Sequence, residues 1–428
     1  MEGITISAFF RHILPRRFRS ELVLVLDIGT FSVKALIGER KKEGYSIISR
    51  SVREYVGGEM NADGSLNVSG ITHTVRQALG DLKHSENKRR LAPKKLVLGI
   101  GGGFVYGKTL LQTYIRDNPE TEIDAREFVN IIQKCEQRSF EQIRKFFHRE
   151  TERSELEVRI IQAVIQEIKI DGYEVKNPVG FKGKEVSLAL FNAYIPKIYA
   201  KIFEDLASVL KLELVSIVSA PYEVFRVVMK NTKSGGDFIL LDMGGSMTEV
   251  ALARKGKLED IRAIPMGGSS FTRRISESLK IGFWEAENIK RKLGTSLLGK
   301  SVSKKLEDMI LRDAELFLHS LALILNDFSQ VTLLPSRVYL YGGGSVLPIF
   351  QKLFLEHTWR DTLSFFAKPT IELLTPASLG EAVNMQGISD VDMHWTIPYG
   401  IAISQLLKEK SEEDTAKILR RSLRLIQS

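Results

Sequence analysis

The sequence has one cysteine, no long apolar run and no cluster of histidines. Cys135 is the only cysteine among 428 residues, so no internal disulfide can form and a reducing compartment is expected. The apolar runs are strand-sized and stay well short of the roughly 20 residues that cross a membrane. The seven histidines lack the spacing of metal ligands. We therefore expect no membrane-spanning helix, no zinc site and no cysteine nucleophile.

The length and composition indicate a large globular protein. A chain of 428 residues exceeds one ordinary hydrophobic core, so two lobes or more are expected. Hydrophobic residues make up 43% and charged residues 26%, which excludes wholesale disorder and fibrous repeats. No signal peptide is expected, because the basic cluster around Arg16 follows the apolar residues near the start instead of preceding them.

The net charge of +9 is concentrated at the two ends of the sequence. Residues 1–20 carry +3 and residues 416–428 carry +4, which leaves only +2 for everything between them. A nearly neutral body argues against a broad nucleic-acid-binding face. Basic ends are typical of segments that contact an anionic surface.

Three segments combine a β-rich apolar run with a glycine turn. They are residues 21–39, 237–258 and 337–354. In the first two, apolar runs flank the turn on both sides, which predicts hairpins. In the third, Pro348 and an apolar-periodic segment follow the glycines, which predicts a strand, a loop and a helix. Helical patterns alternate with these strands, so we expect α/β lobes. The expected helices are residues 71–82, 125–147, 195–210, 268–279, 285–293 and 304–328.

The two predicted hairpins resemble each other and carry the residues expected to bind a polyphosphate. Glycine turns let backbone N–H groups approach an anion closely. Carboxylates beside a polyphosphate are expected to hold Mg²⁺ through water, which suits Asp27 and Asp242. Either hairpin alone could be an ordinary tight turn, but together they favour a nucleotide site. The other candidates in the hairpins are Gly29, Thr30, Phe31, Ser32, Lys34, Gly244, Gly245, Ser246 and Thr248.

The third segment and a helix before it supply candidates for the nucleoside. Bare backbone at a strand end could lie against a base or a ribose. Glu287 and Lys290 lie three residues apart and so share one helical face, although an ordinary surface ion pair is the alternative. The glycine run 99–103 is interpreted as a strand end, because no P-loop lysine follows in register. The candidates in the third segment are Gly342, Gly343, Gly344 and Ser345.

Residues 416–426 predict an amphipathic helix on a membrane surface. At about 100° per residue, the apolar side chains and the cations occupy separate arcs. Four cations without an acid favour a helix at anionic headgroups over one docked on the body. The segment 6–14 could form a second, weaker membrane-binding helix, which would end at Pro15. The residues expected at the membrane are Ile418, Leu419, Arg420, Arg421, Leu423, Arg424 and Ile426.

These motifs in this order resemble the actin-like ATPase superfamily, and within it the FtsA family. The further resemblance to FtsA lies in residues 160–191, which are similar to a family pattern of a strand, an Asp-Gly turn and Asn-Pro-x-Gly-x-x-Gly. The matching positions of that last motif are Asn177, Pro178, Gly180 and Gly183. The resemblance implies an α/β, two-lobed actin-like ATPase fold with an FtsA-type IC subdomain. The implied parts are a basic amphipathic segment 1–20, subdomain IA 21–91 with 176–233 and 397–407, subdomain IC 92–175, subdomain IIA 234–255 with 330–396, subdomain IIB 256–329, a linker 408–415 and a membrane-targeting helix 416–428.

The resemblance also implies a function. It implies a cytoplasmic protein that binds ATP and Mg²⁺, self-associates into filaments and is peripheral on the cytoplasmic face of the cell membrane. Through the FtsZ tail, such a protein tethers the FtsZ ring in cell division and recruits later division proteins. No nucleic acid is expected as a partner. A pilus assembly protein related to PilM and a small-molecule kinase of the same superfamily are the alternatives.

Three departures from the family pattern affect these expectations. Ser246 stands where the family usually has a third glycine, which adds a Cβ beside the phosphates. Only 100 residues separate Asp242 from Gly342, so the β-rich insertion expected in IIB, the docking site for the FtsZ tail, is missing. Ala220 stands where brisk ATPases place Glu or Gln, so we expect weak or absent hydrolysis.

Overall fold

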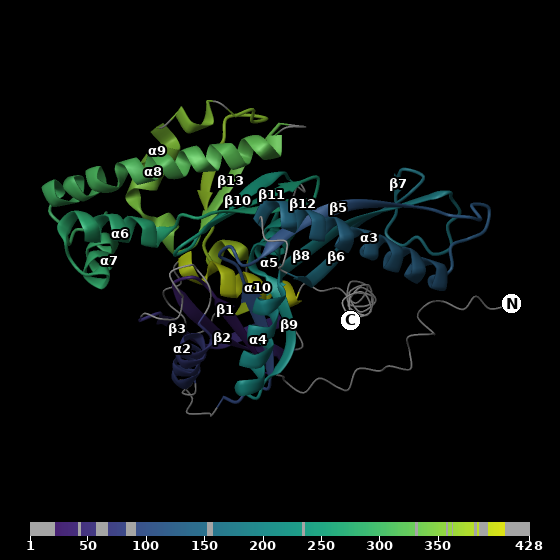
Figure 1. Cartoon of the computed structure of the whole chain (residues 1–428), viewed down its shortest axis with the longest axis horizontal. Helices are drawn as coiled ribbons and strands as arrows, with labels where there is room; N and C mark the ends of the chain where they lie inside the picture. Colours follow the sequence, from purple (N-terminus) through teal and green to yellow (C-terminus); the bar gives the residue numbers. More distant parts are fainter. Residues whose placement is uncertain are drawn as a thin grey trace.

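The computed structural model contains two sheets that are flanked by helices (Figure 1). The expected segments 1–20, 408–415 and 416–428 lie outside the part of the chain that it describes. The described residues are 22–41, 44–56, 67–82, 91–151, 157–232, 236–329, 333–356, 358–361, 363–380, 383–384 and 393–406.

A six-stranded sheet forms the body that we call lobe I. Its strand order is β15-β3-β2-β1-β4-β9, with β1 antiparallel to β2 and parallel to β4. The strands are β1 (Leu22–Ile28), β2 (Ser32–Lys41), β3 (Gly44–Glu54), β4 (Lys95–Ile100), β9 (Glu213–Ser219) and β15 (Val383–Asn384). Its helices are α2 (Val68–Asp81), α4 (Lys197–Val209), α5 (Ala220–Asn231) and α10 (Thr396–Leu406).

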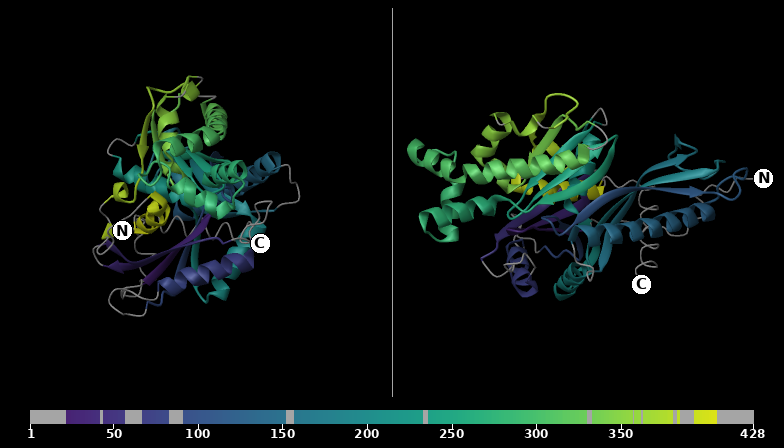
Figure 2. Two further views of the ribbon diagram at one scale, coloured as in Figure 1. Left: turned by 90° about the vertical axis from the view of Figure 1, so that its left-hand side faces the viewer. Right: turned by 45° about the horizontal axis from the view of Figure 1, so that its top comes forward.

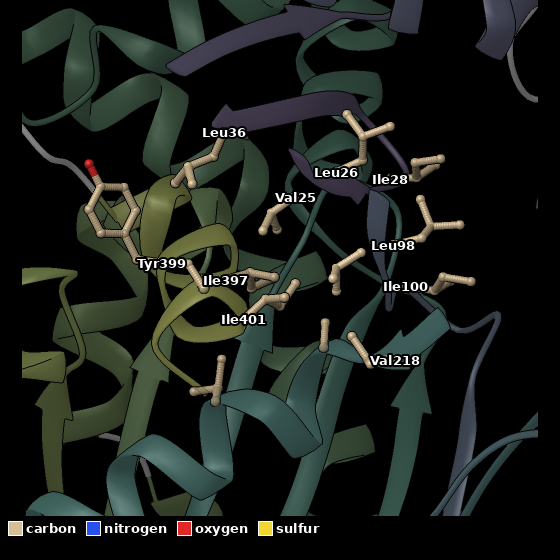
Figure 3. Packing of buried hydrophobic residues seen from close by; sticks show 14 of the residues in the cluster. Val25, Leu26, Ile28, Leu36, Leu98, Ile100, Val218, Ile397, Tyr399 and Ile401 are labelled. Atoms are coloured by element: carbon tan, nitrogen blue, oxygen red, sulfur yellow. The ribbon is translucent and has the colours of Figure 1, made fainter. Parts of the chain in front are cut away.

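Helices cover both faces of the central strands of lobe I. Helix α10 packs on β1 and α5, and α2 packs on β2, β3 and α4. Figure 3 shows Ile397 and Ile401 of α10 among the side chains of the central strands, including Val25. A strand that is covered on both faces reads as a continuous apolar run, which explains the run in β1.

The second sheet has nine strands and runs through two further bodies. Its order is β14-β13-β10-β11-β12-β5-β8-β6-β7. We call β10–β14 with their helices lobe II, and β5–β8 with α3 the arm. The strands are β5 (Tyr106–Ile115), β6 (Val158–Ile170), β7 (Tyr173–Glu174), β8 (Glu185–Pro196), β10 (Phe238–Met243), β11 (Thr248–Arg254), β12 (Lys257–Ile264), β13 (Arg337–Tyr341) and β14 (Thr370–Leu373).

The arm extends away from lobe II, as Figure 1 and the right view of Figure 2 show. Helix α3 (Ala125–Thr151) lies along β5 and β8. The strand pairing that joins the arm to lobe II is short. Strand β12 pairs with β5 only at Asp260 with Lys108 and at Ile261 with Gly107. Lobe II carries the helices α6 (Gly268–Leu279), α7 (Phe283–Arg291), α8 (Lys300–Ser329) and α9 (Pro348–Glu356).

Strand β10 shows how the two lobes share a core. Its alternate residues Phe238 and Leu240 belong to the cluster that contains lobe I, whereas Ile239 and Leu241 belong to the cluster under α8. Helix α5 contacts β10, β11 and β12 as well as α10. The two lobes are therefore joined by apolar packing behind the cleft between them.

The predicted hairpins are confirmed, since β1 pairs with β2 and β10 pairs with β11, both antiparallel. The helical patterns are confirmed as α2, α3, α4, α6, α7 and α8, whereas α5 was not predicted. In the segment 256–329, one strand precedes three helices, so the described residues contain no β-rich insertion. None of the described helices is long and apolar enough to cross a membrane.

Three strands pair outside the subdomain to which the resemblance assigns their residues. Strand β4 lies within 92–175 but pairs with β1 of lobe I, and β8 follows residue 176 but pairs with β5 and β6 of the arm. Strand β15 lies within 330–396 but pairs with β3. These pairings join segments that are distant in the chain, which hydrophobic periodicity does not reveal.

Glu136 of α3 is a fully buried carboxylate whose oxygens have no hydrogen-bond partner among the described residues. Burial raises its pKa from 4.5 to about 8. The folded state therefore holds a proton that the unfolded state releases above its own lower pKa. Stability should accordingly fall as pH rises from about 4.5 to 8.

Replacing this carboxylate should remove that pH dependence. We expect Glu136→Gln to be more stable than the natural chain at pH 7, by up to roughly 3 kcal/mol, with the difference vanishing near pH 4.5. Thermal unfolding between pH 5 and 8 measures it. Glu141→Gln on the exposed face of α3 is the control. If Glu136→Gln and the natural chain differ in stability by the same amount at every pH in this range, the raised pKa of Glu136 is contradicted.

Candidate functional site

A cavity of about 420 Å³ lies between the two lobes, a volume typical of small-molecule sites. Both hairpins, α7 and the loop after β13 line it. The predicted residues that line the cavity are Asp27, Gly29, Thr30, Phe31, Ser32, Lys34, Asp242, Gly244, Gly245, Glu287, Lys290, Gly342, Gly343 and Gly344. The structure thus brings together residues that are more than 300 positions apart in the chain.

The first hairpin presents one carboxylate and one cation to the cavity. Asp27 and Lys34 face each other in the β1–β2 register, and Lys34 Nζ lies 2.8 Å from Asp27 Oδ2. The turn is closed by the N–H of Gly29, which donates to the carbonyl of Ser32 at 3.1 Å. The antiparallel register therefore pairs the two charges before any ligand is considered.

The second hairpin lies directly against the first. The backbone N–H of Ser246 donates to Thr30 Oγ1 at 2.9 Å. A Cβ on Gly245 would lie only 2.4 Å from Phe31 Cβ, a distance that real Cβ atoms do not adopt. Glycine at position 245 is therefore required for the close approach of the two turns.

Three predicted residues, Ser246, Thr248 and Ser345, are not among the residues that line the cavity. Thr248 Oγ1 donates to the carbonyl of Met266 at 2.8 Å, and Ser345 Oγ donates to the carbonyl of Gly342 at 2.7 Å. Ser246 contacts Thr30 through its backbone. The role of these three residues in binding a nucleotide stays a prediction.

Two buried carboxyl groups lie side by side in the second hairpin, and burial favours the protonated form of each. Burial raises the pKa of Asp242 to about 7, and the nearby Asp27 adds to the rise while Lys34 opposes it. Glu249, opposite Asp242 in the β10–β11 register, has a pKa raised to about 8 by burial and then by Asp242. Asp242 Oδ1 has no hydrogen-bond partner among the described residues.

The carboxylates of Asp27 and Asp242, which both line the cavity, fit a divalent cation held partly through water. Oxygen ligands suit Mg²⁺, which commonly keeps several waters and takes one or two carboxylates together with phosphate oxygens. The orphaned oxygen of Asp242 is the observation that supports this fit. No group of three or more metal-binding side chains occurs among the residues described, so the protein alone does not form a complete cage.

Glu287 and Lys290 form a buried ion pair at the α7 side of the cavity. Lys290 Nζ lies 2.7 Å from Glu287 Oε2 and also donates to the carbonyl of Gly268 at 2.9 Å. Burial lowers the pKa of Lys290 against the opposing effect of Glu287. Burial raises the pKa of Glu287, but Lys290 and the hydrogen bonds that Glu287 accepts outweigh this effect. The pKa of Glu287 is therefore lowered. The surface ion pair considered from the sequence is thus a buried one.

The loop after β13 places glycine against Asp242. Gly342 has φ of 86°, and a Cβ there would lie 2.4 Å from Asp242 Oδ1 and 2.6 Å from the carbonyl oxygen of Met243. The short helix η1 (Gly343–Val346) begins at the next residue. A Cβ on Gly343 would meet nothing within 4 Å.

This contrast gives a matched pair of variants. Gly342→Ala should lower stability by about 2 kcal/mol or more, because alanine is strained at this φ and would collide with backbone. Gly343→Ala should change stability little. Thermal unfolding of both variants measures the difference, and equal midpoints would contradict the packing of this loop.

Sequence reasoning missed several residues of the cavity. Gly101 and Gly102 follow β4 and line it, since β4 pairs in parallel with β1 and ends beside the first hairpin. The glycine run was visible, but only the pairing places it at the site. The other residues not predicted are Val52, Glu54, Gly268, Ser269, Arg291, Leu293, Val346, Leu347, Met393, His394 and Ile397.

Comparison with solved structures identifies the fold. A chain of the PilM-PilN type IV pilus biogenesis complex matches with a TM-score of 0.61 and 16% identity, covering 89% of this chain and 97% of that one. This likeness shows the fold alone. The fold is the actin-like ATPase fold, as the motifs predicted.

Comparison of sequences then points to one family. Residues 239–379 match the family model described as cell division protein FtsA. The chain is related in sequence to the FtsA proteins, which confirms the predicted resemblance. The FtsA of Bacillus subtilis is 22% identical over 278 residues, covering 64% of this chain and 58% of that protein. The FtsA of Streptococcus pneumoniae is 20% identical over 350 residues, covering 77% and 72%. The match thus spans less than two thirds of the Bacillus subtilis protein.

Proposed function

We propose that this chain is an actin-like, ATP-binding cell division protein that assembles on the cytoplasmic face of the cell membrane and tethers the FtsZ ring. The observation that supports it best is the meeting of two glycine hairpins and a buried Glu-x-x-Lys pair around one cavity. The relatives named cell division protein FtsA supply the division role.

The polyphosphate would lie between the two hairpins. The backbone N–H groups of the two glycine turns that are not bonded within the turns would donate to phosphate oxygens, because no Cβ of Gly29, Gly244 or Gly245 covers them. Lys34 would add a cation. Asp27 and Asp242 would hold Mg²⁺ through water. When bound, this ion would neutralise part of the phosphate charge.

The nucleoside would lie between α7 and the loop after β13. Glu287 would accept hydrogen bonds from ribose hydroxyls, while Lys290 holds this carboxylate in place at 2.7 Å. Apolar side chains from both lobes, including Leu293 and Ile397, line the cavity and suit a flat base.

We propose that hydrolysis is slow or absent. Ala220 is fully buried at the start of α5, and a methyl group cannot accept a proton or orient water. The chain would then use nucleotide chiefly to select a conformation.

We propose three kinds of partner. The FtsZ tail would dock on the helices of residues 256–329, although the segment lacks the β-rich insertion of the family. Further copies of the chain would form filaments through the arm. Anionic membrane would bind residues 416–426, which makes the protein peripheral on the cytoplasmic face.

Co-sedimentation tests the division role. We expect the purified chain to pellet with FtsZ polymers, and to lose this binding when the FtsZ tail is removed. FtsZ polymers that leave the chain in the supernatant at tens of micromolar would contradict the role. A pilus assembly role, suggested by the fold shared with PilM, would instead place the gene among pilus genes.

A further inference from the structure

The mouth of the cavity is crossed by contacts that the proposed function does not use. Arg291 of α7 reaches from lobe II to lobe I, where one of its terminal nitrogens lies 2.7 Å from Glu54 Oε1. The same guanidinium lies over the Phe31 ring, 5.6 Å from its centroid. Trp284 of α7 contacts that ring as well, with centroids 5.7 Å apart. All of these side chains except Trp284 line the cavity.

The lobe I side of this contact is held rigidly to the first hairpin. Glu54 lies opposite Ser32 in the β2–β3 register. The next residue, Tyr55, donates its N–H to the carbonyl of Phe31 and its hydroxyl to the carbonyl of Gly29, both at 3.0 Å. Any movement of Glu54 therefore moves the turn that would carry the phosphates.

The lobe II side is held to the residues proposed for the nucleoside. Arg291 Nε donates to Glu287 Oε1 at 2.9 Å, and Glu287 is itself bound to Lys290 and Thr272. One guanidinium thus joins the phosphate turn of lobe I to the nucleoside pair of lobe II. Its partners lie on both sides of the opening, at the surface end of the cleft.

We propose that Arg291, bound to Glu54 and Glu287 and lying over Phe31, forms an interlobe latch that keeps the cleft closed and slows release of nucleotide. This inference rests on the proposed function for its ligand. Arg291 and Glu54 side chains are 45% and 41% exposed, so the pair is weakened by solvent and salt. A latch of this strength suits a reversible closure rather than a permanent one.

Arg53 and Asp81 provide a control for the loss of a partly exposed ion pair. Their side chains lie 2.6 Å apart and are 47% and 38% exposed, close to the values of the Glu54–Arg291 pair. Both belong to lobe I, on β3 and α2. Breaking this pair removes an equivalent ion pair from the same strand without affecting contacts across the cleft.

The first measurement is release of a fluorescent ATP analogue with Mg²⁺, chased by excess ATP in a stopped-flow instrument. We expect Glu54→Gln to release it about two- to fivefold faster than the natural chain, and Glu54→Lys faster still, because two cations would then repel. Arg53→Gln should match the natural chain. Raising the salt should accelerate release from the natural chain more than from Glu54→Gln.

The second measurement needs no nucleotide. Spin labels on Arg76→Cys of α2 and Ser296→Cys of lobe II report the distance between the lobes, and both sites are exposed. The natural Cys135 is buried and its pKa is raised to about 11 by burial, so it should stay unlabelled. We expect longer distances in Glu54→Lys than in Arg53→Gln.

The two measurements separate the claims. If the natural chain does not bind the ATP analogue, the proposed function fails and the effect on release fails with it, while the spin labels still decide whether the latch closes the cleft. If the analogue binds but Glu54→Lys and Arg53→Gln show equal release rates and equal distances, the latch is wrong and the nucleotide site stands.

Discussion

Deleting residues 416–428 is expected to reduce binding to anionic vesicles by about a thousandfold. The deleted segment carries four cations and no acid. Each basic residue near an anionic membrane contributes about 1 kcal/mol, so the charges alone account for about 4 kcal/mol. Burial of the apolar face adds to this. Vesicle flotation at low and high salt measures the loss, and binding of the full chain should weaken as salt rises.

A point variant separates the apolar face from the charge. Leu419→Glu places a carboxylate among the expected acyl contacts while all four cations remain. Gln427→Glu makes the same change of charge at roughly 180° on the helix, outside the apolar arc. We expect the first variant to lose most of the vesicle binding and the second to lose little. If the truncated chain floats as well as the full chain, the proposed anchor is wrong.

Gly245→Ala is expected to weaken ATP binding by about a hundredfold. The added Cβ would lie 2.4 Å from Phe31 Cβ and 3.2 Å from Thr30 Oγ1, so the two hairpins must separate. Donors that face one polyphosphate from both sides depend on that spacing, and a loss of about 2.7 kcal/mol corresponds to this factor. Calorimetry with ATP and Mg²⁺ measures it.

Gly299→Ala is the control for this variant. A Cβ at Gly299 would meet nothing within 4 Å, and the residue lies just before α8, outside the cavity lining. We expect it to bind ATP as the natural chain does. Equal affinity of the two variants would show that the polyphosphate does not lie between the hairpins.

The parts of the site that follow from local patterns could be predicted from the sequence. An Asp-x-Gly turn between two apolar runs specifies a hairpin with its carboxylate at the end of a strand, and both hairpins have this form. The Glu287–Lys290 spacing specifies one helical face. Two such turns in one chain already predicted a polyphosphate site between two hairpins.

The parts that depend on pairing between distant segments could not be predicted. Gly101 joins the site only because β4 pairs with β1, and Glu54 contacts Arg291 only because β3 and α7 meet across the cleft. Hydrophobic periodicity gives the face of each element but not its neighbour. The same limit explains why β8 pairs within the arm and β4 within lobe I, although the expected subdomain boundaries placed them elsewhere.

Calorimetric titration of ATP into the full chain, with and without Mg²⁺, tests the central claim most directly. We predict one site per chain, with affinity that rises when Mg²⁺ is present and with this gain lost in Asp242→Asn, which removes a charge at nearly constant volume. No binding at millimolar ATP, with or without Mg²⁺, would contradict the nucleotide site and the function built on it.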